Sequence, residues 1–240
     1  MCDTCGCGDP AVVAVEVHEK ILAGNDRTAA HNREHFVERG LFAINLMGSP
    51  GAGKTAVLEA TARAFAGRRR LGAVAGDLAT DADAARLREA GIPAISITTG
   101  SACHLDASMV HRALHDFPWR ELDYLFIENV GNLVCPAVYD LGQAANVVAL
   151  SVTEGEDKPL KYPVMFRKAD LVLLTKVDLL PHLDVRVEAI EDALARVMPR
   201  PVLFRLSART GEGLSSWLDW LEAGRPVATA AARVRQRTMA

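Results

Sequence analysis

The chain has 240 residues, of which 50% are hydrophobic and 24% are charged. This composition predicts a folded globular protein and excludes wholesale disorder. The formal net charge of −3 argues against a general nucleic-acid-binding protein. No segment has the roughly 18 unbroken apolar residues of a membrane span. The first ten residues, MCDTCGCGDP, also lack the basic and apolar regions of a secretory signal. We therefore expect a cytoplasmic protein with neither a nucleic-acid nor a membrane partner.

Residues 1–10 include three of the five cysteines, Cys2, Cys5 and Cys7. Thiolates bind soft and borderline metals, and a peptide this short can bring three sulfurs to one ion. If Met1 is removed, the free α-amine adds a fourth donor, and this set suits square-planar Ni²⁺, while copper and zinc also fit. A redox dithiol and a segment without function are the alternatives, but a redox pair normally begins a helix in a folded context. We predict a flexible metal-binding leader.

Residues 11–40 have a mostly helical pattern, and Gly40 ends it as a glycine just beyond a helix commonly does. The letters AGND at 23–26 interrupt the pattern. We therefore predict two short amphipathic helices in this segment. At the other end of the chain, residues 224–240 contain no clear element and are predicted to form a flexible tail.

Residues 41–223 alternate between short apolar runs and helical patterns. Alternation of this kind predicts an α/β domain with a mostly parallel sheet flanked by helices. Such sheets place their functional sites at the carboxyl ends of the strands. The runs lie at 41–47, 71–76, 93–98, 123–128, 146–152, 170–175 and 202–206, and the helical patterns at 54–66, 81–90, 105–116, 160–168, 184–197 and 213–222.

A phosphate-binding motif follows the first apolar run. The letters GSPGAGKT at 48–55 match the pattern G-x-x-x-x-G-K-[S/T] in full and open a helical segment. In this motif, backbone N–H groups and the helix N-terminus hold phosphates, the lysine reaches the β- and γ-phosphates, and the hydroxyl binds Mg²⁺. An ordinary glycine-rich turn is the alternative, and the strand before and helix after disfavour it. We expect the nucleotide phosphates and Mg²⁺ to contact Gly48, Ser49, Gly51, Ala52, Gly53, Lys54, Thr55 and Ala56.

Two acidic residues follow other apolar runs. Asp77 ends the second run and is predicted to bind Mg²⁺ directly or through water. Glu128 ends the fourth run in the position of a Walker-B acid. The alternatives are a helix cap for Asp77 and an ordinary strand end for Glu128, and we expect nearby Asp81 to be only a helix cap. The predicted catalytic set is Lys54, Thr55, Asp77 and Glu128.

The nucleotide base is predicted to be guanine. The letters TKVD at 175–178 resemble the guanine motif N-K-x-D, in which the aspartate, here Asp178, accepts hydrogen bonds from donors that adenine lacks. Lys176 would cover the base, and Thr175 in place of asparagine is expected to lower the affinity. Ser207 and Ala208 follow the last apolar run and would place a backbone group near the guanine oxygen. GTP is therefore favoured over ATP, with a solvated loop as the alternative.

A second metal-binding group is predicted at the sheet edge. Cys103 and His104 follow the third apolar run and Cys135 follows the fourth, so their loops emerge at the same edge of a parallel sheet. Two thiolates and one imidazole are too few for a closed site, which suggests water, metal exchange or ligands from a two-fold partner. The remaining histidines are expected to be structural: His18, His31, His35, His111, His115 and His182.

Together these motifs resemble the HypB family of hydrogenase maturation GTPases that incorporate nickel. The resemblance runs from the leader to the last apolar run, in the segments MCDTCGCG, GSPGAGKT, GDLATDADAARL, TTGSACHLDA, IENVGNLVCP, GEDKPLKYP and LSARTGEG. It implies a P-loop NTPase fold, GTP and Mg²⁺ as ligands, and a GTP-dependent homodimer. It also implies delivery of Ni²⁺ to the [NiFe]-hydrogenase large-subunit precursor, together with an accessory metallochaperone of the HypA type.

The resemblance also implies residue roles. Cys2, Cys5 and Cys7 correspond to the leader nickel site, and Cys103, His104 and Cys135 to a nickel or zinc site at the dimer interface. Loss of the γ-phosphate is expected to shift the loops of Cys103 and Cys135 and so to change metal affinity. A urease-type nickel GTPase is an alternative, although its relatives use a Cys-Pro-His site. A passive nickel store and a P-loop kinase of a small metabolite are the others.

Overall fold

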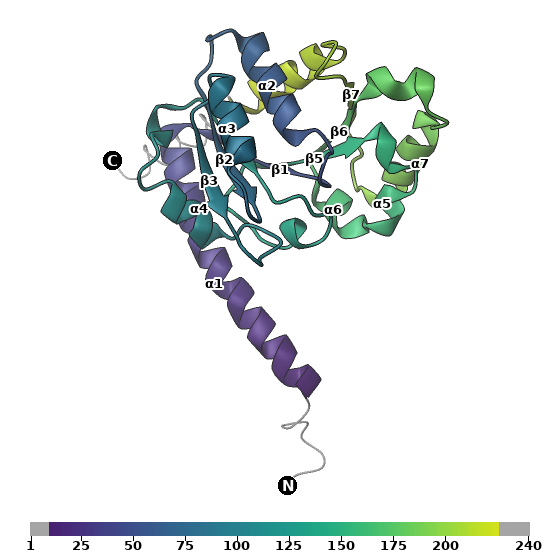
Figure 1. The fold of residues 1–240 in the computed structure, drawn as a ribbon. Helices are drawn as coiled ribbons and strands as arrows, with labels where there is room; N and C mark the ends of the chain where they lie inside the picture. The colour runs from purple at the N-terminus through teal and green to yellow at the C-terminus, as the bar shows by residue number, and fades with distance from the viewer. Residues whose placement is uncertain (1–9, 226–240) are drawn as a thin grey trace.

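The computed structural model describes residues 10–225, with side chains described from residue 22 (Figure 1). The predicted leader site of Cys2, Cys5 and Cys7 lies outside the described residues, as does most of the predicted tail. Among the helices that are described, none is both long and apolar enough to cross a membrane.

A seven-stranded sheet forms the centre of the molecule, in the order β3-β2-β4-β1-β5-β6-β7. Every pair of neighbouring strands is parallel, and the central strands are buried on both faces, as parallel sheets generally are. Each predicted apolar run forms a strand, within a residue or so at either end. The strands are β1 (Phe42–Met47), β2 (Leu71–Asp77), β3 (Ala94–Thr98), β4 (Tyr124–Glu128), β5 (Ala145–Ser151), β6 (Leu171–Thr175) and β7 (Leu203–Leu206).

Helices cover both faces of this sheet. The helices after α1 are α2 (Lys54–Phe65), α3 (Ala82–Glu89), α4 (Ala107–Ala113), α5 (Lys158–Lys161), α6 (Pro163–Lys168) and α7 (Val187–Val197), and another covers residues 214–225. Short 3₁₀ turns lie at Trp119–Glu121, Cys135–Ala137, Val152–Glu154 and Val177–His182.

The prediction of a single helix over 160–168 is wrong. Two helices, α5 and α6, meet at Tyr162, because a residue that precedes a proline disfavours the helical conformation.

The hydrophobic core lies in two layers, one on each face of the sheet. On one face, α2, α3 and the helix over 214–225 pack on Phe126 and Tyr124. Trp217 is fully buried there and donates a hydrogen bond from Nε1 to Thr61 Oγ1 at 2.8 Å. On the other face, α1 and α4 cover one half of the sheet, and α6 and α7 cover the other. This packing fixes the carboxyl edge of the sheet as a rigid platform for loops.

The first helix, α1 (Pro10–Arg39), is continuous over 30 residues. The prediction of two short helices is therefore wrong. A glycine inside a helix costs about 1 kcal/mol, and tertiary contacts next to Gly24 outweigh that cost. Asn25 donates to the carbonyl oxygen of Asp140 at 2.9 Å and accepts from the backbone N–H of Ala107 at 2.9 Å. Gly40, with φ of 65°, ends the helix as predicted. Figure 1 shows the N-terminal end of α1 projecting away from the sheet and its C-terminal half lying against α4.

Candidate functional site: a phosphate-binding loop beside a thiol–imidazole cluster

The loop over 48–53 joins β1 to α2 and curls tightly. Gly48, Gly51 and Gly53 have φ values of 147°, 75° and 90°, a region that residues with a Cβ rarely adopt. A Cβ at Gly48 would also collide with the carbonyl oxygen of Ala149 in β5. The loop conformation therefore depends on glycine, as the sequence motif predicts.

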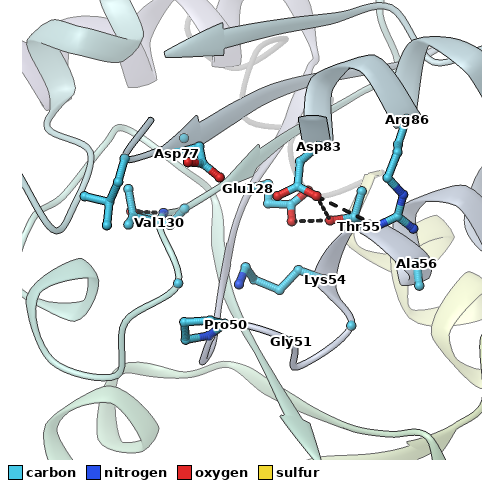
Figure 2. A pocket seen from close by; sticks show the side chains of 15 residues that line it. Pro50, Gly51, Lys54, Thr55, Ala56, Asp77, Asp83, Arg86, Glu128 and Val130 are labelled. Carbon is cyan, nitrogen blue, oxygen red and sulfur yellow. Dashed lines mark hydrogen bonds and ion pairs between the residues drawn. The ribbon is translucent and has the colours of Figure 1, made fainter. Parts of the chain in front are cut away.

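The pocket above this loop has a volume of about 420 Å³ and is lined by Lys54, Thr55, Asp77, Asp83 and Glu128, among others (Figure 2). Thr55 lies in the first turn of α2, and its Oγ1 lies 2.7 Å from Glu128 Oε1 and 3.0 Å from Asp83 Oδ1. One hydroxyl hydrogen serves only one of these two carboxylates at a time. Glu128 Oε2 is buried with no hydrogen-bond partner. Hard cations prefer oxygen ligands, so this group of oxygens fits Mg²⁺.

Burial shifts the pKa values of the two ionisable groups at the centre of the pocket, Glu128 and Lys54, and each group opposes the shift of the other. Burial raises the pKa of Glu128 to about 7, although the hydrogen bond from Thr55 and the nearby Lys54 ammonium oppose the shift. Burial lowers the pKa of Lys54, with Glu128 and Asp83 opposing. The Lys54 ammonium donates to the carbonyl oxygens of Gly48 at 3.3 Å and Ser49 at 3.1 Å. It therefore already lies over the phosphate-binding loop.

Asp83 was missed by the sequence analysis. It lies in the first turn of α3 and contacts Thr55, whereas the carboxylate of Asp77 accepts hydrogen bonds from the backbone of Ala79 and Thr80 at 2.9 and 3.2 Å. These bonds lower the pKa of Asp77 and keep it ionised at the pocket edge. Asp81 precedes α3 but makes no side-chain cap, and its carboxylate pairs instead with Arg88 at 2.5 Å. The sequence did contain a signal for Asp83: it follows Asp81 by two residues, at the start of the helical segment after Asp77.

A second pocket, of about 440 Å³, adjoins the first and shares Gly53 and Ala56 with it. It is lined by three of the four residues predicted to contact guanine, Lys176, Asp178 and Ala208, whereas the fourth, Ser207, is buried beneath it. The two pockets form a continuous groove from the phosphate-binding loop to the ends of β6 and β7. A groove of this arrangement suits a nucleotide with its base in the second pocket.

The predicted base-contacting residues hold one another in place. Thr175 donates to the carbonyl oxygen of Ala52 at 2.6 Å, so its hydroxyl ties β6 to the phosphate-binding loop. Lys176 has a φ of 59° and donates from Nζ to the carbonyl oxygen of Gly51 at 2.6 Å. Ser207 donates from Oγ to Asp178 Oδ1 at 2.6 Å. The second carboxylate oxygen of Asp178 has only a long ion pair, at 4.0 Å, with the exposed Arg209 guanidinium, so it can still accept from a donor in the pocket.

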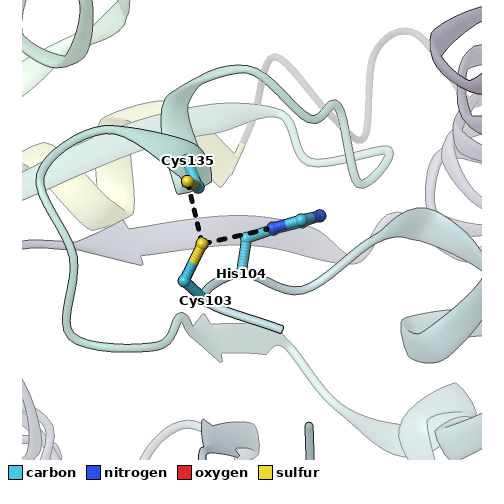
Figure 3. A group of neighbouring side chains, drawn as sticks. All are labelled: Cys103, His104 and Cys135. Carbon is cyan, nitrogen blue, oxygen red and sulfur yellow. Dashed lines mark hydrogen bonds between the residues drawn. The ribbon is translucent and has the colours of Figure 1, made fainter. Parts of the chain in front are cut away.

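Cys103, His104 and Cys135 meet at the carboxyl edge of the sheet (Figure 3). Their candidate ligand atoms lie within 4.8 Å of one another, and the two sulfurs are 2.9 Å apart. All three residues are half-buried. His104 stacks on Tyr139 with ring centroids 3.9 Å apart, and burial lowers its pKa, which favours the neutral, metal-binding form. The Cys103 thiol raises the pKa of Cys135. Among the described residues, the predicted soft-donor cluster is therefore assembled.

A short loop connects the nucleotide groove to this cluster. Asn132 donates its backbone N–H to the carbonyl oxygen of Gly48 at 3.2 Å, and its side-chain amide to the carbonyl oxygen of Cys103 at 3.3 Å. A Cβ on neighbouring Gly131 would lie 2.9 Å from the backbone nitrogen of Pro50. The loop after β4 is thus packed on the phosphate-binding loop at one side and hydrogen-bonded to the thiol loop at the other.

Comparisons with known proteins agree with this geometry. A family model described as the CobW/HypB/UreG nucleotide-binding domain matches residues 42–204. The hydrogenase maturation factor HypB of Azotobacter chroococcum is 52% identical over 223 residues, which is 93% of this chain and 72% of that protein. HypB of Archaeoglobus fulgidus has a TM-score of 0.79 at 41% identity, covering 85% of this chain and all of that one. HypB of Helicobacter pylori, solved in complex with nickel, has a TM-score of 0.80 at 42% identity, covering 85% and 95%.

The sheet order, the glycine-dependent loop and the matched family model define a nucleotide-binding protein with a P-loop NTPase fold. Within that class, the chain belongs to the HypB family of hydrogenase maturation factors.

Proposed function

We propose that the protein is a GTP-hydrolysing nickel metallochaperone that delivers Ni²⁺ to the precursor of a [NiFe]-hydrogenase large subunit. The observation that carries the proposal is the hydrogen-bonded contact, through Asn132, between the phosphate-binding loop and the loop of Cys103. Binding and loss of a γ-phosphate at the phosphate-binding loop would thereby be coupled to the position of the residues proposed to hold the metal. Family membership supports the hydrogenase target and an accessory partner of the HypA type, with the chain acting in the cytoplasm.

The proposed reaction is hydrolysis of GTP to GDP and phosphate. Thr55, Asp83 and Glu128 supply the oxygens that would hold Mg²⁺, directly or through water, and this ion would neutralise charge on the phosphates. Lys54 binds the β- and γ-phosphates from the loop side. Asp77, ionised at the pocket edge, is the proposed group that orients the attacking water.

Guanine selectivity is assigned to Asp178. The Asp178 oxygen that Ser207 does not contact, which has only a long ion pair with exposed Arg209, accepts from the donors on the Watson–Crick edge of guanine. Adenine lacks those donors, and the lost hydrogen bonds would cost about 1–3 kcal/mol. Lys176 covers the base with its aliphatic stem, and the backbone of Ala208 lies in the same pocket. GTP is therefore the proposed substrate rather than ATP.

Cargo Ni²⁺ is assigned to Cys103, His104 and Cys135, with Zn²⁺ as an alternative occupant, and a GTP-favoured homodimer is proposed to complete the ligand set. Three protein ligands fall short of a closed four-coordinate site. Beside the cluster, Val134 and Val138 leave 50% and 39% of their surface exposed. Apolar side chains next to an incomplete metal site support a second copy of the chain as the source of the missing ligands.

The proposal is tested by titrating Ni²⁺ into the reduced, metal-free chain with GDP and then with a non-hydrolysable GTP analogue. A background variant with Cys2, Cys5 and Cys7 replaced by alanine removes the leader donors, and thiolate-to-nickel charge-transfer absorption reports the remaining site. We expect the affinity to differ between the two nucleotides, and the absorption to vanish when C103A and C135A are added. Equal affinity with both nucleotides would refute the coupling, and absence of GTP turnover would refute the enzyme assignment.

A further inference from the structure

A second group of metal-ligating side chains lies between α1 and α4 and shares no residue with the thiol–imidazole cluster. His31 and His35 are one turn apart on α1, and their Nε2 atoms are 3.1 Å apart. His111 on α4 packs against His31 with ring centroids 5.3 Å apart. Their helical surroundings predicted structural roles, but the fold brings the nitrogens of His31 and His35 together and places His111 beside them, with His35 and His111 lining one groove.

The spacing of the first two histidines suits a shared ion. Metal–nitrogen distances of about 2.0–2.1 Å place two bound imidazole nitrogens about 3.0–3.4 Å apart at the angles of common coordination geometries. The observed 3.1 Å between the Nε2 atoms of His31 and His35 falls in this range. Histidines four residues apart on a helix face the same way, which is the spacing used by helical zinc sites.

The protonation of His111 is fixed by a buried neighbour. Asn32 uses its amide group to donate to the carbonyl oxygens of Ala107 at 3.0 Å and Leu141 at 3.2 Å. Its Oδ1 therefore acts as the acceptor for His111 Nδ1, 3.0 Å away. With the hydrogen on Nδ1, Nε2 carries the lone pair that binds metals. A backing hydrogen bond of this kind orients metal-binding histidines in general.

The groove leaves these nitrogens reachable from solvent. It is lined by His35 and His111 and has a volume of about 660 Å³. His31, next to it, and His111 are exposed, while His35 is half-buried beside Trp119. Burial and the neighbouring histidines lower the pKa of His111, which favours the neutral ring. An ion bound here would replace the single hydrogen shared by His31 and His35.

We propose that His31 and His35, with His111 beside them, form a second metal site, which binds a late first-row divalent cation through the Nε2 atoms of His31 and His35, completed by water. Imidazole suits Ni²⁺, Cu²⁺ and Zn²⁺, whereas hard cations such as Mg²⁺ and Ca²⁺ prefer oxygen. The site is independent of the nucleotide groove and of the thiol ligands, so it would hold metal in either nucleotide state.

The test uses the full chain with all five cysteines replaced by serine, and Ni²⁺ as the probe. We expect equilibrium dialysis to detect one bound equivalent, with X-ray absorption showing nitrogen and oxygen donors and no sulfur. Adding H31Q and H35Q is expected to weaken binding at least about tenfold, because even loss of a backing residue costs that much. H182Q, at an exposed histidine elsewhere, is the matched control and should bind Ni²⁺ as the parent does.

A second measurement does not depend on the folding of the cysteine-free variant. In the chain with its cysteines, H31Q with H35Q is expected to bind one Ni²⁺ equivalent fewer than the unmodified chain and to keep its thiolate absorption. Undiminished nickel stoichiometry in this variant, or no nickel binding by the cysteine-free chain, would overturn the proposal.

Discussion

Glu128 combines a buried position with an unpaired oxygen, and this gives the nucleotide-free protein a defined pH dependence. Burial raises its pKa from 4.5 to about 7. In the unfolded chain the same carboxyl group ionises near its ordinary value. Between these two values the unfolded chain releases its proton first, so the folded state loses stability as the pH rises. Below the ordinary value both states hold the proton and the effect is absent.

We expect this group to remove about 2 kcal/mol from the free energy of unfolding between pH 5 and pH 8. The variant Glu128→Gln cannot ionise and should lack that part of the pH dependence. Chemical denaturation of the nucleotide-free protein at both pH values measures the difference. Glu89→Gln, at an exposed position, serves as the control and should follow the unmodified protein. Parallel pH profiles for Glu128→Gln and the unmodified protein would contradict the prediction.

Residue identity was predictable where a motif fixes both type and place. Lys54, Thr55 and Glu128 follow from motif spacing and the ends of apolar runs, and the structure brings them into one pocket. Asp83 was not predictable in this way, because its contact with Thr55 depends on how α3 packs beside α2. The role of Thr175 was also hidden, since its hydrogen bond to the phosphate-binding loop spans 123 residues of sequence.

At the scale of elements, the contact between the loop after β4 and the phosphate-binding loop has little spare room. In the variant Gly131→Ala, the new Cβ would lie 2.8–3.0 Å from atoms of Pro50, two of them backbone. Overpacking of this kind costs about 1–3 kcal/mol. If the phosphate-binding loop shifts to relieve it, nucleotide affinity should fall about five- to hundredfold. Isothermal titration with GDP measures the loss.

Gly24→Ala is the matched control for that variant. A Cβ at Gly24 meets nothing within 4 Å, and the residue is inside a helix. We expect unchanged nucleotide affinity and a gain in stability of up to about 1 kcal/mol. If Gly131→Ala binds GDP as tightly as Gly24→Ala does, the close contact has no effect on the nucleotide groove.

Strands were predicted more closely than helices, for a physical reason. A buried parallel strand is a continuous apolar run, so its limits are visible in the sequence, as β1 and β6 illustrate. A helix end depends on local competition and on tertiary contacts. The AGND segment of α1 has a poor helical propensity on its own, but Asn25 and Asn32 anchor it to the start of α4 and to the loop at Asp140. Those contacts involve residues more than seventy positions away and are not visible locally.

At the scale of the whole molecule, Asn132 connects the phosphate-binding loop to the loop of Cys103, and so connects the proposed nucleotide and metal sites. The variant Asn132→Ala removes the side-chain hydrogen bond to Cys103 and keeps the backbone contact with Gly48. We expect GTP turnover to change little, while the difference in nickel affinity between the GDP and GTP-analogue states shrinks. Phosphate release and Ni²⁺ titration in both states measure the two effects separately.

Arg205→Ala is the control for this variant, because it removes an exposed ion pair with Glu191 on the edge strand β7. It should preserve both turnover and the nucleotide dependence of nickel binding. A full nucleotide dependence in Asn132→Ala would show that coupling follows another route through the molecule. Loss of turnover in Asn132→Ala would instead place this residue in the catalytic machinery.

The sulfur atoms of Cys103 and Cys135, 2.9 Å apart, also make the cluster sensitive to oxidation. A disulfide needs the sulfurs at about 2.05 Å, so only a small approach separates the thiol pair from a covalent bond. A two-electron oxidant that accepts the electrons, with release of both thiol protons, would join them and remove two of the three donors. Bound metal would protect the thiols by engaging the same electron pairs. The proposed metal site is thus usable only under reducing conditions: bound metal and a Cys103–Cys135 disulfide exclude each other.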